Sequence, residues 1–228
     1  MSALKLLRTI KSENFIWEYW EDEKGRQFVK KRLLDLPKSI AISTLREQGF
    51  PEKYLDPIEK ETLRNSVVID GVEFPIEAFE IARRWAKEKF PLSLLLLGSV
   101  GTGKTQAVVT ATWWLLKKRK IATAKFYSAM ELRTAFDKGE LQKDIKEVDL
   151  LVIDDLGREY RSDYNAYIVE VVITTRYDLQ KPVAITTNIT FEEIAKRYTP
   201  RVLDRLQEWA YKKIVKQNFS LRGILGIL

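Results

Sequence analysis

One stretch of the sequence, residues 98–106, restricts the fold more than any other. It reads Gly-Ser-Val-Gly-Thr-Gly-Lys-Thr-Gln and fits the pattern G-x-x-x-x-G-K-[ST]. This pattern forms a phosphate-binding loop when a strand precedes it and a helix follows it. Residues 92–97 are an apolar run typical of a buried strand, and residues 106–120 have the spacing of a helix. The sequence therefore predicts a P-loop α/β fold built around this strand, turn and helix.

Each residue type in the loop suits contact with the phosphates of a nucleotide. Glycines allow backbone N–H groups to crowd around phosphate oxygens, and the N-terminus of the following helix adds partial positive charge. Lys104 is long enough to reach the β- and γ-phosphates, and the Thr105 hydroxyl is expected to bind magnesium. We expect ATP or ADP to be bound by Gly98, Ser99, Val100, Gly101, Thr102, Gly103, Lys104, Thr105 and Gln106.

The composition limits the remaining chemistry. The 228 residues include neither Cys nor His, which excludes disulfides, thiolate zinc sites and imidazole catalysis. Carboxylates and lysines are left for acid–base work. No apolar run approaches membrane-spanning length, so we expect a cytoplasmic protein without membrane contact. The net charge of +7 permits nucleic-acid binding but does not by itself indicate it.

The chain divides into two regions of different composition. Residues 1 to about 65 are rich in aromatic and charged side chains, and the turn signal at residues 22–25 predicts a hairpin of two strands, or a strand followed by a helix. From Val67 onward strand and helix patterns alternate regularly, which predicts a domain with a parallel sheet. The expected strands of that domain cover residues 92–97, 122–127, 150–153, 183–186 and 211–216.

Helix signals lie between these strands. A helix is expected to begin near Pro75, and capping boxes at residues 128–131 and 190–193 are expected to open two more. Residues 164–179 are rich in β-branched side chains, but the segment is too long for an ordinary strand and is therefore expected to be a helix. A further short helix is expected to start at residues 199–200.

Two carboxylates end the strand expected at residues 150–153. A hydrophobic strand that finishes in Asp154 and Asp155 would place both at the carboxyl edge of the sheet, where ligands bind in such folds. We expect Asp154 to hold magnesium and Asp155 to orient or deprotonate the attacking water. Asn188 closes the next expected strand and is a candidate for positioning that water, although an ordinary turn asparagine also fits.

Arginines gather late in the chain. Hydrolysis at a subunit interface needs a cation that neutralises the charge building on the γ-phosphoryl group. Arg205 and Arg222 are the candidates, and the sequence pattern does not separate them from solvated surface arginines.

The motifs occur in an order that resembles the DnaC/DnaI/IstB group of AAA+ ATPases. The shared segments are GSVGTGKT, LLVIDDLG, TTRYD, KPVAITTN, RVLDRL and FSLRG, with GFPEKY at residues 49–54 as a lead-in. The resemblance covers roughly residues 49–225 and implies an ASCE-type AAA+ domain: a parallel five-stranded sheet with flanking helices, preceded by a small N-terminal partner-binding region. It also implies that Asn188 is sensor 1, that Arg205 is an arginine finger reaching a neighbouring subunit's nucleotide, and that Arg222 is sensor 2. Asp155 stands where many relatives have Glu.

The resemblance also implies partners, and it is strongest to the helicase loaders of the group. A loader would bind ATP and magnesium, self-associate through Arg205, contact single-stranded DNA and deliver a DnaB-type replicative helicase gripped by residues 1–48. An IstB-like regulator of a transposase on duplex DNA and a non-hydrolysing adaptor are alternatives that the core motifs do not separate.

The N-terminal region and the DNA-contacting region are the least determined parts. Many loaders carry cysteine zinc ligands before the lead-in segment, whereas residues 1–45 here have none, so aromatic packing rather than zinc is expected to hold them. The regions that relatives use on single-stranded DNA correspond to Phe136, Tyr160 and Arg161, each of which is explained as readily by packing or by an ordinary surface position.

Overall fold

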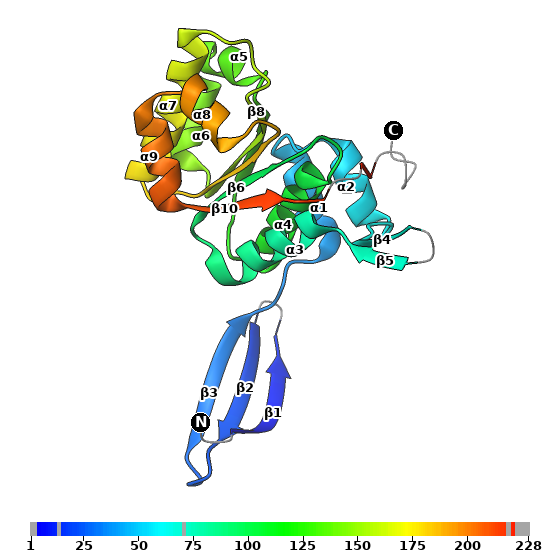
Figure 1. The fold of residues 1–228 in the computed structure, drawn as a ribbon. Coiled ribbons are helices and arrows are strands. Elements are labelled where there is room, and N and C mark those ends of the chain that lie inside the picture. The colour runs from blue at the N-terminus through cyan, green and yellow to red at the C-terminus, as the bar shows by residue number, and fades with distance from the viewer. Residues whose placement is uncertain (1–3, 13–14, 70–71, 218–219, 222–228) are drawn as a thin grey trace.

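A five-stranded parallel sheet forms the centre of the molecule (Figure 1). The structure is a computed structural model and describes residues 4–12, 15–69, 72–217 and 220–221. The strands pair in the order β10-β6-β9-β8-β7, and every neighbouring pair is parallel, which confirms the predicted fold class. The strands are β6 (Ser93–Gly98), β7 (Ala124–Ser128), β8 (Leu150–Leu156), β9 (Val183–Thr187) and β10 (Ala210–Val215).

Helices cover both faces of this sheet, because side chains along each strand alternate between two cores. Leu94 and Leu96 of β6 belong to the buried cluster under α1–α4, whereas Leu95 and Leu97 belong to the cluster under α5–α9. The helices are α1 (Lys38–Glu47), α2 (Glu52–Glu59), α3 (Glu77–Arg84) with its π-helical turn η1 (Trp85–Lys89), α4 (Lys104–Lys117), α5 (Leu132–Asp137), α6 (Glu140–Glu147), α7 (Asp163–Asp178), α8 (Phe191–Arg197) and α9 (Pro200–Trp209).

Helix α7 confirms the helix expected at residues 164–179, and its Arg176 links the segments that precede β8 and β9. Arg176 is completely buried, and its guanidinium donates to the carbonyls of Val148 at 2.7 Å, Asp149 at 3.0 Å and Pro182 at 2.6 Å. Val148 and Asp149 immediately precede β8, and Pro182 immediately precedes β9. One side chain therefore fixes where both strands start. Burial lowers the pKa of Arg176 to about 10, which leaves the side chain charged at neutral pH.

Three local predictions were wrong at element boundaries. Pro75 ends strand β5 (Val72–Pro75) instead of opening a helix, and α3 begins two residues later. Residues 128–131 form a turn without a capping box, because the Ser128 hydroxyl donates to the Glu131 carboxylate and α5 starts at Leu132. Helix α4 ends at Lys117, three residues early. The box at residues 190–193 is present with both of its hydrogen bonds.

A separate antiparallel sheet projects from this body (Figure 1). We call it the projecting sheet; it consists of β1 (Lys5–Lys11), β2 (Phe15–Glu21) and β3 (Gln27–Leu33), with β2 in the centre. The predicted turn at residues 22–25 joins β2 to β3, and the Asp22 carboxylate accepts backbone N–H bonds from Lys24 and Arg26. The hairpin interpretation with two strands is therefore confirmed.

The rest of the N-terminal region packs onto the body. Helix α1 buries Ala41, Ile42 and Leu45 in the core cluster under α4, and Leu36 N–H donates to the Lys117 carbonyl at 2.8 Å. A short hairpin, β4 (Ser66–Ile69) and β5, precedes α3. We therefore call residues 38–221 the nucleotide-binding unit in structural descriptions.

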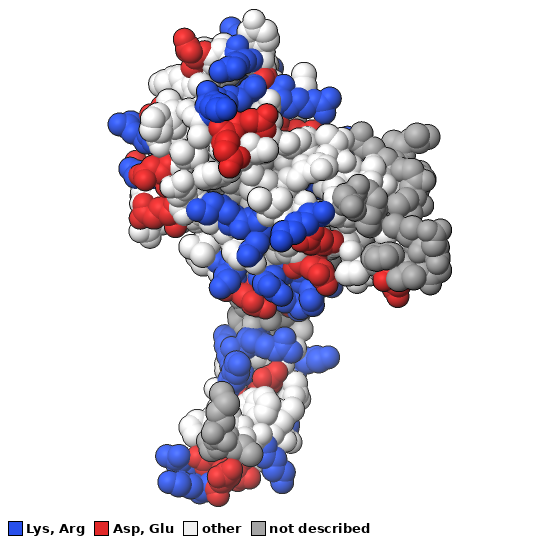
Figure 2. All heavy atoms as spheres, viewed as in Figure 1, with Lys and Arg blue, Asp and Glu red and all other residues white. Residues whose placement is uncertain are grey.

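The surface of the nucleotide-binding unit carries charges of both signs. On the face shown in Figure 2, Lys and Arg are interleaved with Asp and Glu over the nucleotide-binding unit. Among the helices of the described residues, none is both long enough and apolar enough to cross a lipid bilayer.

Candidate functional site

The P-loop follows β6 directly and has the backbone shape that its glycines permit. Gly101 and Gly103 both have φ of +82°, in the left-handed region that residues with a Cβ rarely adopt. Gly103 caps α4, so the unbonded N–H groups of the first helical turn face the loop. A Cβ on Gly101 would collide with the Ser220 hydroxyl, and Leu221 N–H donates to the Gly101 carbonyl at 2.8 Å. The end of the described chain therefore lies against the P-loop.

Lys104 connects the P-loop to the neighbouring strand β9. Its Nζ donates to the carbonyls of Gly98 at 2.8 Å and Ser99 at 2.7 Å, and to Asn188 Oδ1 at 2.8 Å. The side chain is buried, with 5% of its residue surface exposed. The predicted phosphate-binding lysine and the predicted sensor asparagine are thus direct neighbours, although they are 84 residues apart in the chain.

Asp154 and Thr105 form the second half of the site. The Thr105 hydroxyl donates to Asp154 Oδ1 at 2.6 Å, and the Thr186 hydroxyl donates to the same oxygen at 2.6 Å. Burial raises the pKa of Asp154, and these two hydrogen bonds oppose that shift. A hydroxyl and a carboxylate in contact are an oxygen-only donor set, which suits magnesium. The residues present therefore fit the metal expected there.

Asp155 reaches the site because β8 bulges. The pairing between β8 and β9 shifts after Ile153, and Asp155 has φ of +55°, which Asp tolerates better than most residues. The Asp155 carboxylate accepts from Asn188 Nδ2 at 2.9 Å and from Arg158 at 3.2 Å. The bulge turns the side chain of Asp155 towards Asn188, so Lys104, Asn188 and Asp155 form one continuous chain of hydrogen bonds.

Gln106 makes a different kind of contact from the rest of the loop. Its backbone lies in the first turn of α4, while its side-chain Nε2 donates to the Tyr54 carbonyl at 2.8 Å. Tyr54 belongs to α2, in the lead-in segment recognised at residues 49–54. The side chain of Gln106 therefore ties that segment to the P-loop helix.

Of the two predicted arginines, Arg205 makes its contacts outside this cluster. Arg205 on α9 makes an ion pair with Asp204 at 3.5 Å, and its guanidinium stacks on the Tyr177 ring at 4.2 Å. Arg201 is more exposed and pairs with Glu170 at 3.2 Å. Arg222 lies outside the described residues, and its neighbour Leu221 is buried against Gly103.

Sequence reasoning missed two groups that hold the site in place. Thr186 donates to Asp154 and accepts the Asp155 N–H at 2.9 Å, so it aligns both carboxylates. Buried Glu159 accepts from Gly157 N–H, Arg197 Nε and the Tyr198 hydroxyl, which fixes the loop after Asp155 to α8. Thr186 belongs to the run before Asn188 and was detectable as a strand residue; Glu159 carried no signal.

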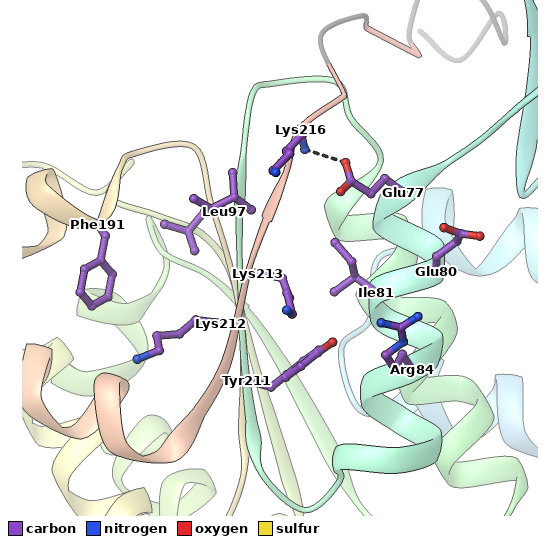
Figure 3. Close-up of a pocket in the computed structure, with 11 residues that line it drawn as sticks. Glu77, Glu80, Ile81, Arg84, Leu97, Phe191, Tyr211, Lys212, Lys213 and Lys216 are labelled. Carbon is purple, nitrogen blue, oxygen red and sulfur yellow. Dashed lines mark hydrogen bonds between the residues drawn. The ribbon is translucent and has the colours of Figure 1, made fainter.

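A groove of about 560 Å³ lies elsewhere, along edge strand β10 (Figure 3). Lys213 and Tyr211 point towards α3, while Lys212 points towards Phe191 on the other side of the strand (Figure 3). No residue of the P-loop and neither carboxylate lines this groove, so it is separate from the predicted nucleotide site. Lysines beside an unpaired edge strand are an ordinary protection against strand addition.

The fold and the site together define a P-loop nucleotide-binding protein of the AAA+ type. Residues 85–222 match the family described as IstB-like ATP binding protein, and the chain belongs to that family. Its relatives place it in the DnaC/DnaI/IstB group.

Three relatives illustrate the similarity. The replicative helicase loader DnaC of Escherichia coli K12 is 31% identical over 122 residues, which is 50% of each chain, so the chain spans about half the length of this curated relative. A crystal structure of the DnaC helicase loader superposes with a TM-score of 0.54 and 26% identity, over 61% of this chain and 89% of that one. The replication initiator DnaA bound to AMPPCP and single-stranded DNA shares the fold, with a TM-score of 0.52 and 20% identity over 62% of this chain and 46% of that one.

Proposed function

We propose that this protein hydrolyses ATP and uses the nucleotide to load a replicative DNA helicase. The observation that carries the proposal is a hydrogen-bonded cluster in which Thr186 joins two groups, Lys104–Asn188–Asp155 and Thr105–Asp154. These side chains meet at the carboxyl ends of β6, β8 and β9, the edge where parallel α/β sheets bind ligands. Phosphoryl transfer needs this combination of a cation, metal ligands and a group that orients water.

Each residue of the cluster has a role in the proposed reaction. Lys104 would turn its ammonium from the Gly98 and Ser99 carbonyls to phosphate oxygens, while the N–H groups at the start of α4 bind the same phosphates. Magnesium, held by Thr105 and Asp154, would supply charge neutralisation between the phosphates. Asp155 would orient the attacking water or take its proton, and Asn188 would hold Asp155 and the water in line.

In the proposed mechanism, a second copy of the chain completes the nucleotide site. Arg205 is engaged by Asp204 and Tyr177 on α9 and α7, and we assign it to the nucleotide of a neighbouring subunit. A monomer would then hydrolyse ATP slowly, because the charge on the γ-phosphoryl group lacks its cation. Arg222 is proposed as sensor 2, because the chain that leads to it contacts the P-loop through Leu221.

The partners are proposed from the relatives and the exposed surfaces. We assign capture of a DnaB-type helicase to the N-terminal region, residues 1–48, ahead of the AAA+ domain at residues 49–228. DnaC relatives are named as helicase loaders, and a DnaA structure holds single-stranded DNA, which supports both partners. The DNA contact is assigned to the loop and helices near Phe136 and Tyr160; Tyr160 is 82% exposed, whereas Phe136 packs against Tyr164.

A second candidate is an IstB-like ATPase that regulates a transposase on duplex DNA. The family match favours it, because the matched family is described by the IstB name. The two candidates share the nucleotide site and differ in the protein that residues 1–48 capture. Tight, nucleotide-independent binding to duplex DNA would favour this candidate over the loader.

One experiment decides between them. The full-length protein is mixed with the host's replicative helicase in the presence of magnesium and either ATP or ADP, and the complex is isolated by size exclusion. A helicase loader forms a complex whose yield depends on the nucleotide, whereas a transposase regulator forms no complex with the helicase in either state.

Hydrolysis is tested separately with Lys104→Ala and the matched surface variant Lys118→Ala. We expect Lys104→Ala to lower the DNA-stimulated ATPase rate about hundredfold or more, while Lys118→Ala keeps the wild-type rate. Equal rates in wild type and Lys104→Ala would instead leave only a nucleotide-gated adaptor.

A further inference from the structure

One face of the projecting sheet carries a row of aromatic side chains. On central strand β2, Phe15, Trp17 and Tyr19 alternate with residues of the other face, so all three rings lie on one side. In the antiparallel register, Trp17 lies opposite Lys31 of β3, and Tyr19 lies opposite Arg8 of β1. We call these five residues the aromatic face.

Cations are interleaved with the rings of the aromatic face. Lys31 Nζ lies 3.7 Å from the centre of the Phe15 ring and 4.8 Å from that of Trp17. The Arg8 guanidinium lies 4.1 Å from the centre of the Tyr19 ring. Each ring of the row therefore has a positive charge within cation–π distance, and both cations stay at an exposed surface.

Most acidic residues of the projecting sheet lie away from the aromatic face. Glu21 shares its side of β2, but it lies at the tip end of the strand, opposite Lys5 of β1. Glu18 belongs to the opposite face and pairs with Arg32 at 3.2 Å. Asp22 lies in the tip turn and pairs with Arg26 at 2.8 Å. Figure 2 shows Lys and Arg near the junction of the sheet with the body, and acidic residues gathered with them at the far tip.

The aromatic face is not part of a protein core. Every residue of β1 and β3 is exposed, and Ile16, which points to the opposite face, is the one buried residue among the described residues of the three strands. Phe15, Trp17 and Tyr19 are half-buried. Their rings are accordingly available to a partner.

We propose that the aromatic face binds single-stranded nucleic acid. The bases would stack on Phe15, Trp17 and Tyr19, and Arg8 and Lys31 would pair with the phosphates beside them. Alternate residues of a strand are about 6.6 Å apart, roughly twice the spacing of stacked bases, so the row accommodates a strand with opened stacking. A polyanion with π faces complements rings and cations together, whereas an acidic peptide complements only the cations.

This inference goes beyond the proposed function, which gives single-stranded DNA to the nucleotide-binding unit and a protein partner to the N-terminal region. The opposite face, with Trp20 and Phe28 paired across β2 and β3, remains free for that protein. The projecting sheet would then bring the DNA strand and the helicase together on one small module.

The test measures binding of a fluorescein-labelled 20-mer of thymidylate to the full-length, nucleotide-free protein by anisotropy at low salt. The double variant Arg8→Gln/Lys31→Gln removes two charges from the aromatic face, and Lys11→Gln/Lys30→Gln removes two from the opposite face. We expect the first to weaken binding about tenfold and the second less than about threefold. If both double variants weaken binding equally, binding depends only on general charge attraction and the proposal is wrong.

Stacking is tested independently of charge. Trp17→Ala should weaken binding at least about fivefold, whereas Trp17→Phe should keep most of the affinity and abolish the quenching of tryptophan fluorescence that the oligonucleotide causes. Unchanged affinity in Trp17→Ala would overturn the stacking arrangement. Circular dichroism of each variant checks that the fold is retained.

The failure of this inference is distinguishable from failure of the proposed function. If Arg8→Gln/Lys31→Gln loses helicase capture but keeps the affinity of the wild type for the oligonucleotide, the aromatic face is a protein surface and the inference is wrong. The ATP-dependent part of DNA binding, measured as the difference between wild type and Lys104→Ala in ATP, tests the nucleotide-binding unit alone.

Discussion

The projecting sheet and the parallel sheet have strands of similar length, but their residues differ in how far they are buried. Strand β2 has one buried residue in seven, whereas β8 has six in seven. Each fully buried leucine-sized side chain contributes about 1.5–3 kcal/mol, so the parallel sheet stabilises itself and can hold a bulge and a left-handed aspartate at its edge. The projecting sheet relies on cross-strand pairs and is suited to gaining contacts from a partner.

The largest effect that this comparison predicts is at Arg176. Arg176→Met would remove the guanidinium donors from the carbonyls of Val148, Asp149 and Pro182, of which Pro182 still accepts Leu151 N–H at 3.3 Å. We expect a loss of about 3–5 kcal/mol in the free energy of unfolding by urea. Arg133→Met, at an exposed arginine of α5, is the control and should change stability by less than about 1 kcal/mol. Equal losses would show that burial of the guanidinium does not matter.

A smaller effect is expected where the site is fastened to α8. Glu159→Ala removes the acceptor shared by Arg197 and Tyr198, and we expect a loss of about 2–3 kcal/mol together with faster proteolysis within residues 157–162. Glu208→Ala removes an exposed acceptor from Tyr177 and should cost less than about 1 kcal/mol. If the loop stays resistant to protease in Glu159→Ala, this anchor is not what orders it.

The difference between the regions also explains what the sequence could predict. Strand β6, the P-loop and α4 were predictable because glycine spacing and an apolar run act locally, and α7 was predictable from its length. The bulge at Asp155, the donors from Thr186 and the carbonyl contacts of Arg176 depend on neighbours far away in the chain, which a local pattern does not contain.

The wrong predictions of element boundaries also arose because pairing partners lie far away in the chain. Pro75 suits both the first turn of a helix and the end of an edge strand, and its pairing opposite Ser66 decided for the strand. For the projecting sheet, the turn at Asp22 was predictable from composition, whereas the assignment of rings to one face required the register of β2 with β3.

At Asp154 we expect a substitution to stabilise the protein, in contrast to the losses predicted for Arg176 and Glu159. Because burial raises its pKa, the charged carboxylate destabilises the folded protein at pH values above that pKa, and the penalty disappears as the pH falls towards the ordinary value of 3.8. In a buffer without magnesium or nucleotide, Asp154→Asn should therefore be slightly more stable than wild type at pH 7, by less than the losses above. The gain should shrink on acidification in parallel urea titrations. A less stable Asp154→Asn at pH 7 would contradict this account.

The smallest effect is expected on removal of the projecting sheet, and it tests the comparison most directly. Deleting residues 1–33 keeps the Leu34 carbonyl that accepts from Arg119 and the Asp35–Lys118 ion pair, so the attachment of α1 stays intact. Ile16 is the one buried residue in the described strands that the deletion removes. The free energy of unfolding of the remaining unit should therefore change by less than about 1 kcal/mol. Affinity for ATP should be unchanged, since no residue of the P-loop cluster contacts β1–β3 through the hydrogen bonds described. A large loss of stability would mean that the sheet supports the nucleotide-binding unit, and that the two regions do not differ in the way their burial indicates.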